Sequence, residues 1–170
     1  MESMKMAGEL MIPLEEYPHV PYWFTLRQVT AVMEKMKSPR AQEGGALARF
    51  ALIFDEGYKL LGITRRRDIL RGLELDDWAA AAPRDRQREP GDPGVPRDLG
   101  INQMRAKAER PVSEVMLPIR STVDYEDHLM KVIHEMVRNN LSMLPVLREN
   151  RVVGVIRSVE VFQEIAQFIL

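Results

Sequence analysis

Apolar residues in the second half of this chain first recur at helical spacing and then gather in two short runs. The helical stripe contains Leu129, Val132, Ile133, Met136 and Val137. Asp124 or Asp127 is placed to cap the start of this predicted helix. Residues 142–147 and 151–157, separated by the polar triplet 148–150, predict two buried strands joined by a turn.

The chain ends on a further predicted helix. We expect its buried face to carry four apolar residues: Val161, Phe162, Ile165 and Ile169. The first half shows the same order, with a helix at 25–37, strands at 50–54 and 59–64, a turn at 55–57 and a helix from Arg67. Each half is therefore predicted to be a small helix–strand–strand–helix unit.

Two sequence motifs recur in the same order, which indicates an internal repeat. The ELMIPL of residues 9–14 returns as EVMLPI at 114–119, and the LLGITR of 60–65 returns as VVGVIR at 152–157. The sequence thus predicts a mixed α/β (α+β) fold built from two pseudo-symmetric copies.

The repeat gives the predicted domain boundaries. The first copy covers 1–76, a Pro/Gly-rich linker covers 77–100, and the second copy covers 101–170 and begins with a short helix near 101–109. The first copy also holds extra residues around 38–47, whose paired glycines predict a mobile flap beside its cleft.

The charge and composition of the chain argue against several classes of protein. Lys and Arg number 24 against 25 Asp and Glu, a net charge of -1, so no global field recruits nucleic acid or an anionic membrane surface. The absence of cysteine excludes disulfides, thiolate nucleophiles and cysteine-ligated metals. We find no secretory signal and no apolar run of about 18 residues. We therefore expect a cytoplasmic protein without membrane insertion.

Catalytic and metal-binding patterns are not evident. His19, His128 and His134 lack the spacing of metal ligands, and the sequence has no Ser-His-Asp order and no phosphate-cradling glycine loop. We predict that the protein is not an enzyme, holds no metal and requires no cofactor.

Residues 111–116 (PVSEVM), 144–147 (LPVL) and 152–157 (VVGVIR) together resemble a cystathionine-β-synthase-type (CBS) domain, and residues 9–13 and 60–70 resemble a more divergent one. The chain thus resembles a tandem CBS pair, also called a Bateman module. The resemblance implies that each copy has a short extra N-terminal strand. It also implies that the copies pack through their sheets about a pseudo-two-fold axis, with two clefts between them.

The same resemblance implies a function. CBS pairs are sensors without chemistry of their own, their clefts often bind AMP, ADP or ATP, and two modules often pair. We expect a non-catalytic regulatory module that binds an adenine nucleotide, forms a homodimer and signals to an unknown regulated protein. Apolar residues on the first helices also favour a homodimer: Leu26, Met33, Val132 and Met136. The alternative is a ligand-free structural or dimerisation module.

The family motif places an Asp six residues after a Gly, with Ser or Thr three residues before that Asp. The first copy keeps Gly62 and Asp68 at this spacing, but Arg65 takes the Ser/Thr position and Thr64 precedes it. The resemblance implies that Asp68 binds ribose and that Thr64 and Arg65 lie near phosphate. The alternative for Asp68 is that the helix dipole favours an acidic residue in the first turn without any ligand. An arginine beside a helix N-terminus adds phosphate donors, but it is equally placed to pair with the carboxylate three residues on, and both alternatives remain open.

The second copy departs further from the motif, with Arg157 at the Ser/Thr position and Glu160 at the Asp position. The same two alternatives hold for Arg157. Glu160 is favoured in a first helical turn by the helix dipole without any ligand, and its carboxylate lies one methylene further out. We therefore expect the cleft that uses Asp68 to bind nucleotide more tightly than the cleft that uses Glu160.

The resemblance also implies an apolar slot for the base in each cleft. In the first copy we expect it to be built from Met11, Pro13, Val20, Ala51 and Ile53. In the second copy we expect Met116, Pro118, Val123, Met143 and Pro145. Most of these residues would lie in the core of any such fold.

Overall fold

The computed structural model describes residues 3–36, 49–75 and 97–170. The predicted flap at 38–47 and residues 77–96 of the predicted linker lie outside the described residues.

The first half of the chain forms the predicted helix–strand–strand–helix unit, preceded by short elements. In order these are α1 (Ala7–Leu10), β1 (Ile12–Pro13), the 3-10 turn η1 (Leu14–Glu16), β2 (His19–Pro21), α2 (Leu26–Lys35), β3 (Phe50–Phe54), β4 (Leu60–Arg65) and α3 (Arg66–Leu73). A capping box starts α2: the Thr25 hydroxyl accepts the Gln28 N–H at 3.2 Å, and the Gln28 side chain accepts the Thr25 N–H at 2.9 Å.

The second half repeats the helix–strand–strand–helix unit and is also preceded by short elements. It contains α5 (Arg97–Lys107), the 3-10 turn η3 (Val112–Glu114), β5 (Leu117–Pro118), β6 (Val123–Asp124), α6 (Leu129–Asn139), β7 (Met143–Arg148), β8 (Arg151–Arg157) and α7 (Ser158–Ile169). The predicted turn between β7 and β8 is confirmed. Glu149 and Asn150 have φ angles of 50° and 61°, the left-handed conformation that a two-residue type I′ hairpin turn requires.

The predicted aspartate cap of α6 is wrong. His128 occupies the N-cap position, and no side chain caps the helix there. Asp127 instead accepts the Asp124 N–H at 2.8 Å and pairs with Lys131 at 2.9 Å. The carboxylate therefore closes a turn before the helix and forms an i,i+4 ion pair along it.

Each repeat contributes its first strand to the sheet of the other repeat. The strand orders are β2-β3-β4-β5 in one sheet and β1-β8-β7-β6 in the other. Strand β1 runs antiparallel to β8 with Pro13 opposite Gly154, and β5 runs antiparallel to β4 with Pro118 opposite Gly62. The two expected N-terminal strands therefore exist, and they tie the repeats together.

The two paired glycines are required by this exchange. A Cβ atom on Gly62 would lie 2.5 Å from the carbonyl oxygen of Leu117, and one on Gly154 would lie 2.4 Å from that of Ile12. Neither separation is tolerable for a carbon and a backbone oxygen. The recurrence of glycine at this point of both motifs thus reflects the close crossing of an exchanged strand.

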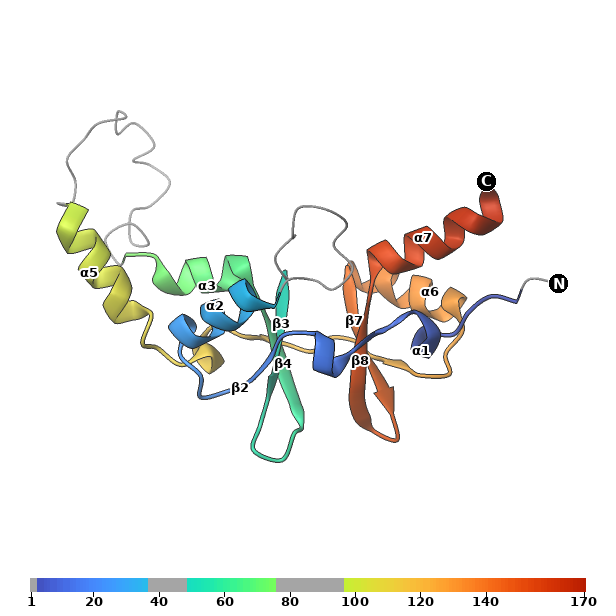
Figure 1. Ribbon diagram of the computed structural model, residues 1–170, viewed down its shortest axis with the longest axis horizontal. Helices are drawn as coiled ribbons and strands as arrows, with labels where there is room; N and C mark the ends of the chain where they lie inside the picture. The colour runs from blue at the N-terminus through green and yellow to red at the C-terminus, as the bar shows by residue number, and fades with distance from the viewer. Residues whose placement is uncertain (1–2, 37–48, 76–96) are drawn as a thin grey trace.

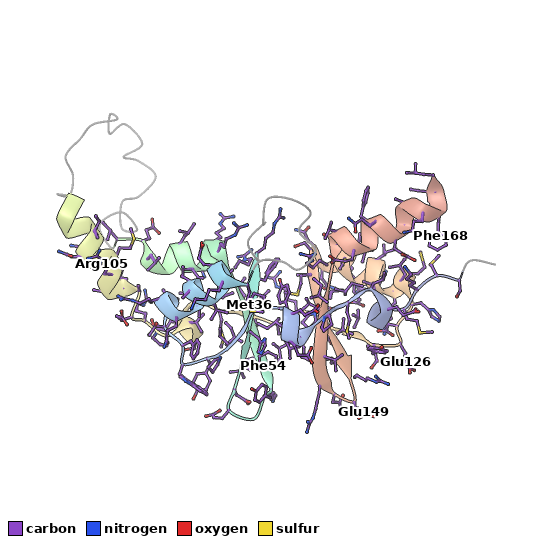
Figure 2. The ribbon with its side chains drawn as sticks, viewed as in Figure 1. Met36, Phe54, Arg105, Glu126, Glu149 and Phe168 are labelled. Carbon is purple, nitrogen blue, oxygen red and sulfur yellow. The ribbon has the colours of Figure 1, made fainter. Side chains whose placement is uncertain are left out.

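The two sheets face each other at the centre of the molecule, and the helices lie outside them (Figure 1). Helices α2 and α3 cover the first sheet, whereas α1, α6 and α7 cover the second. A separate apolar layer fills the space between the sheets: Ile12, Tyr17, Leu52, Phe54, Met143 and Val155. Phe54 of this layer lies on β3 (Figure 2). The expected packing of the copies through their sheets is confirmed.

The predicted buried face of α7 is only partly right. Val161 is buried and Ile165 packs against the same core, but Phe162 and Ile169 are each 72% exposed. The helix is rotated so that Glu160 and Glu164, each 4% exposed, face inward instead. Ion pairs with Arg157 and with Lys5, the latter at 2.9 Å, compensate these buried carboxylates.

The residues that favoured a homodimer are not on the surface. Leu26, Met33, Val132 and Met136 are all buried in the two helix-covered cores. Their apolar character is explained by folding of the single chain. The described helices include none with the length and apolar character of a membrane span.

Candidate functional site

The end of β4 and the start of α3 hold a compact ion pair. Arg65 is the N-cap residue of α3, and its Nε and Nη2 donate to the two carboxylate oxygens of Asp68 at 3.0 Å each. The peptide N–H of Arg65 also donates to Asp68, at 2.9 Å. The ion-pair alternative of the sequence analysis is therefore the arrangement found here.

Asp68 itself is enclosed. Its side chain is 0% exposed, and Arg71 approaches its second oxygen at 3.5 Å. Burial opposes ionisation of this carboxyl, but the hydrogen bonds and charges of Arg65 and Arg71 outweigh burial and hold the pKa of Asp68 below its usual value. The carboxylate is thus ionised and satisfied within the protein.

The second repeat has the equivalent pair at the junction of β8 and α7. Arg157 donates its peptide N–H to Glu160 at 3.1 Å and its Nε at 3.0 Å, and its Nη2 also contacts this carboxylate. These hydrogen bonds raise the pKa of Arg157. The Arg157 side chain is 23% exposed against 40% for Arg65, so the second guanidinium is the less accessible of the two.

A cavity of about 320 Å³ lies between the repeats, beside Arg65. Strands β4 and β5 form one wall, and the segment from α6 into β7 forms the other. The lining residues are Phe50, Ile63, Arg65, Leu117, Pro118, Ile119, Arg120, Ser121, Asn140, Leu141, Ser142, Met143 and Pro145. Its size is that of a small-molecule site, and its wall combines apolar side chains with two arginines.

Ser121 in the cavity wall is hydrogen-bonded to Glu135, a carboxylate that is not among the described lining residues. Glu135 accepts the Ser121 hydroxyl at 2.6 Å and the Asn139 side-chain amide at 3.0 Å. The Ser121 hydrogen bond is the main reason why the pKa of Glu135 is lowered. Ser121 is therefore fixed in position, with its oxygen lone pairs still able to accept.

The structure brings four of the predicted site residues to this cavity: Arg65, Pro118, Met143 and Pro145. Arg65 comes from the first repeat and the other three come from the second. The strand exchange places them together, because it carries Pro118 against β4.

The apolar slot predicted for the first repeat is not formed. Val20, Ala51 and Ile53 are buried beneath α2 and α3 in the first core, and Val123 is buried in the second core. Ile53 pairs with Gly62 just as Val146 pairs with Gly154, so the positions equivalent to Met143 and Pro145 are Phe50 and Leu52. Ala51 and Ile53 are therefore each one residue away from the true counterparts of Met143 and Pro145, and they lie on the opposite face of β3.

The remaining predicted residues lie beside the crossing strands or in the cores. Met11 packs against the second core and Met116 against the first, and Pro13 lies in β1 opposite Gly154. Thr64 is fully buried, and its hydroxyl has no hydrogen-bond partner among the described residues.

The space beside Arg157 differs from the cavity beside Arg65. Six residues separate Pro13 from Val20, whereas four separate Pro118 from Val123. The longer segment forms η1, which lies against β8, and brings Tyr17 into the layer between the sheets. Burial raises the pKa of Tyr17; Arg157 acts to lower this pKa and Glu160 acts to raise it.

Tyr17 was not singled out in the sequence, and the two extra residues before Val20, compared with the second repeat, are a signal that could have found it. Its ring occupies the region next to Arg157, and the neighbouring Glu15 and Glu16 are exposed on the same segment. At the corresponding point of the other repeat stand Arg120 and Ser121, which line the cavity. The segment that carries Tyr17 therefore has two acidic residues where the segment beside Arg65 has an arginine and a serine.

A larger cavity of about 710 Å³ separates the tips of the two hairpins. It is lined by turn residues of both sheets, with Lys59 and Arg151 as its charged members. It contains none of the predicted site residues.

Comparison with known proteins supports the fold. Residues 112–167 match the family model of the CBS domain. No curated protein matches the sequence. A solved CBS domain of a CBS domain-containing membrane protein from Sphaerobacter thermophilus is 20% identical, with a TM-score of 0.65 over 94% of this chain and 87% of that one.

Two similar structures contain nucleotides. CBSX2 in complex with AMP is 14% identical, with a TM-score of 0.62 over 96% of this chain and 97% of that one. The cytosolic domain of the Mg²⁺ channel MgtE in complex with ATP is 21% identical, with a TM-score of 0.60 over 93% of this chain and 48% of that one. At these identities the likeness establishes a shared fold.

Proposed function

We propose that this protein, whose residues 112–167 form a CBS domain within a CBS-pair fold, is a regulatory module that binds an adenine nucleotide beside Arg65. The nucleotide-bound state is then read by a partner protein. The observation that carries the proposal is the cavity between the repeats, which pairs apolar walls with the guanidinium groups of Arg65 and Arg120.

The wall of the cavity suggests how the ligand lies in it. Met143, Pro145 and Pro118 offer an apolar surface to a base, since flat rings bury well against such side chains. Arg65 and Arg120 offer donors to phosphate oxygens. The pair with Asp68 occupies two of the five N–H donors of the Arg65 guanidinium, which leaves three for a ligand.

The proposal assigns one nucleotide to each chain. Beside Arg157 the buried ring of Tyr17 takes up room, and the segment that carries Tyr17 also carries two exposed acidic residues, Glu15 and Glu16, whose charge disfavours a phosphate there. We still propose that the two clefts differ in their affinity for nucleotide. The difference is attributed to Tyr17 and the local charge instead of the length of the Glu160 side chain.

We also propose a second copy of this chain as a partner, in a cytoplasmic homodimer. Helices α6 and α7 expose Met130, Val137, Phe162 and Ile169, and an apolar groove of about 440 Å³ runs between the two helices. A symmetric pair would bury these side chains against each other.

A ligand-free structural module is the second candidate function. It is favoured by one observation: Asp68 and Glu160 are both turned toward arginines of the protein and are buried. A module of this kind would have kept the fold and lost the carboxylate contacts to a ligand.

Thermal unfolding with added nucleotide separates the two candidates. A ligand present at 100 times its Kd stabilises the folded state by about 2.7 kcal/mol. We expect ATP, ADP or AMP at millimolar concentration to raise the melting temperature. An unchanged melting temperature with all three would favour the structural module.

A further inference from the structure

We propose that the cavity beside Arg65 selects its ligand by phosphate charge and does not recognise the ribose diol. Nucleotides and 2′-deoxynucleotides should then bind alike. The proposal rests on the proposed function, because it concerns the same cavity.

The charge of the cavity wall is the first argument. Arg65 and Arg120 are the charged residues among those that line it, and no described lining residue is acidic. A carboxylate is the side chain best suited to a cis-diol, because it has acceptor sites for both hydroxyls and no proton of its own. The described wall thus attracts anions and lacks the group that would hold the sugar.

Asp68 is the second argument. This carboxylate stands at the position expected for ribose binding, but it is fully buried and accepts three hydrogen bonds from Arg65. It does not line the cavity. To reach a ribose it would have to leave both the guanidinium and the helix N-terminus, and these are charge-assisted contacts of the strong kind. Asp68 therefore acts as a positioning residue for Arg65.

The neutral polar residues that line the cavity do not take the place of a carboxylate. Ser121 has committed its proton to Glu135, so it offers only lone pairs, and Ser142 and Asn140 are neutral. A hydrogen bond between neutral groups is roughly half as strong as a charge-assisted one. The phosphate contacts of two guanidinium groups should therefore dominate the affinity.

Calorimetric titration of the full chain with ATP, 2′-deoxy-ATP and adenosine tests the proposal. We expect the Kd of 2′-deoxy-ATP to lie within about threefold of that of ATP, and the Kd of adenosine to be at least about tenfold higher. A Kd for 2′-deoxy-ATP at least about tenfold above that of ATP would overturn the inference and leave the proposed function standing. Absence of heat with every compound would overturn the proposed function and this inference with it.

The Asp68→Asn variant supplies an independent check, because the ratio of the two Kd values is measured within one protein. We expect a ratio near one both in the unmodified chain and in this variant. A ratio of about ten or more in the unmodified chain that falls to one in Asp68→Asn would identify Asp68 as the diol acceptor and overturn the inference.

Discussion

The carboxylate of Asp68 accepts the Nε and Nη2 hydrogen bonds of Arg65 at 3.0 Å each, while its own side chain is sealed from solvent. The pair joins the last residue of β4 to the first turn of α3. It thereby fixes the direction in which the arginine enters the cavity between the repeats.

Replacement of Asp68 by Asn should reduce the free energy of unfolding by about 1–3 kcal/mol at neutral pH, because charge-assisted hydrogen bonds become neutral ones. The folded-state pKa of Asp68 lies below its usual value. The stabilisation is therefore complete above the ordinary carboxyl pKa of about 4 and is lost as the pH falls through the lowered pKa. Urea denaturation at pH 7 and near pH 3 measures both effects.

The exposed Glu74 at the other end of α3 gives the control, since Glu74→Gln should change stability little at either pH. Equal stability of Asp68→Asn and the unmodified chain at pH 7 would contradict the structural role of the pair.

Replacement of Thr64 by valine should increase the stability of the fold. Its hydroxyl is fully buried without a hydrogen-bond partner among the described residues, so Thr64→Val removes an unsatisfied polar group at nearly constant shape. We expect a gain of about 1–3 kcal/mol in unfolding free energy. Thr30→Val is the matched control, because the Thr30 hydroxyl donates to the Leu26 carbonyl at 2.7 Å and its removal should bring no gain. Loss of stability in Thr64→Val would show that the hydroxyl is satisfied in solution.

Gly62→Ala should destabilise the fold and disturb the cavity. The added Cβ would lie 2.5 Å from the Leu117 carbonyl oxygen, so β5 must move, and β5 carries Pro118 into the cavity wall. Overpacking of this kind costs about 1–3 kcal/mol. Gly57→Ala in the hairpin turn should be tolerated, because its Cβ would meet only the Asp55 side chain at 3.4 Å. Equal denaturation midpoints for the two variants would count against the close strand crossing.

The sequence predicted the two repeats and most strand positions, because local alternation and turn residues specify them. It did not predict the strand exchange, since β1 pairs with β8 and β5 with β4 across long stretches of chain. No local pattern encodes such a partner. The recurring glycines of both motifs carried the only trace of it.

Burial was harder to predict than secondary structure. Phe162 was expected inside and is exposed, whereas Glu160 and Glu164 are buried. Hydrophobicity alone misjudged the rotation of α7, because ion pairs with Arg157 and Lys5 allow carboxylates on the inner face. The base slot expected in the first repeat was misplaced for a related reason, since a shift of one residue in a strand exchanges its faces.

If the chain forms a homodimer through α7, a charged residue on the exposed face of this helix should convert the dimer to a monomer. Phe162→Glu would place a charge in the proposed symmetric contact, and the size measured by light scattering should fall from twice 19.6 kDa to 19.6 kDa at micromolar concentration. Tyr58→Glu is the control, because Tyr58 is equally exposed but lies in the β3–β4 turn. A monomer in the unmodified chain, or a dimer that Phe162→Glu leaves intact, would reject this interface.

Arg120 provides the cleanest test of nucleotide phosphate binding between the repeats. Arg120 lines the cavity and is exposed, so Arg120→Ala should fold normally. Arg66, which is exposed at the start of α3 and does not line the cavity, supplies the matched variant Arg66→Ala.

Calorimetric titration of ATP into these three proteins is the decisive measurement. We expect one site per chain in the unmodified protein, an unchanged Kd in Arg66→Ala and a Kd about 10- to 100-fold higher in Arg120→Ala, the equivalent of one lost charge-assisted hydrogen bond. Two equal sites per chain, or an Arg120→Ala variant that binds ATP as tightly as the unmodified protein, would contradict this expectation.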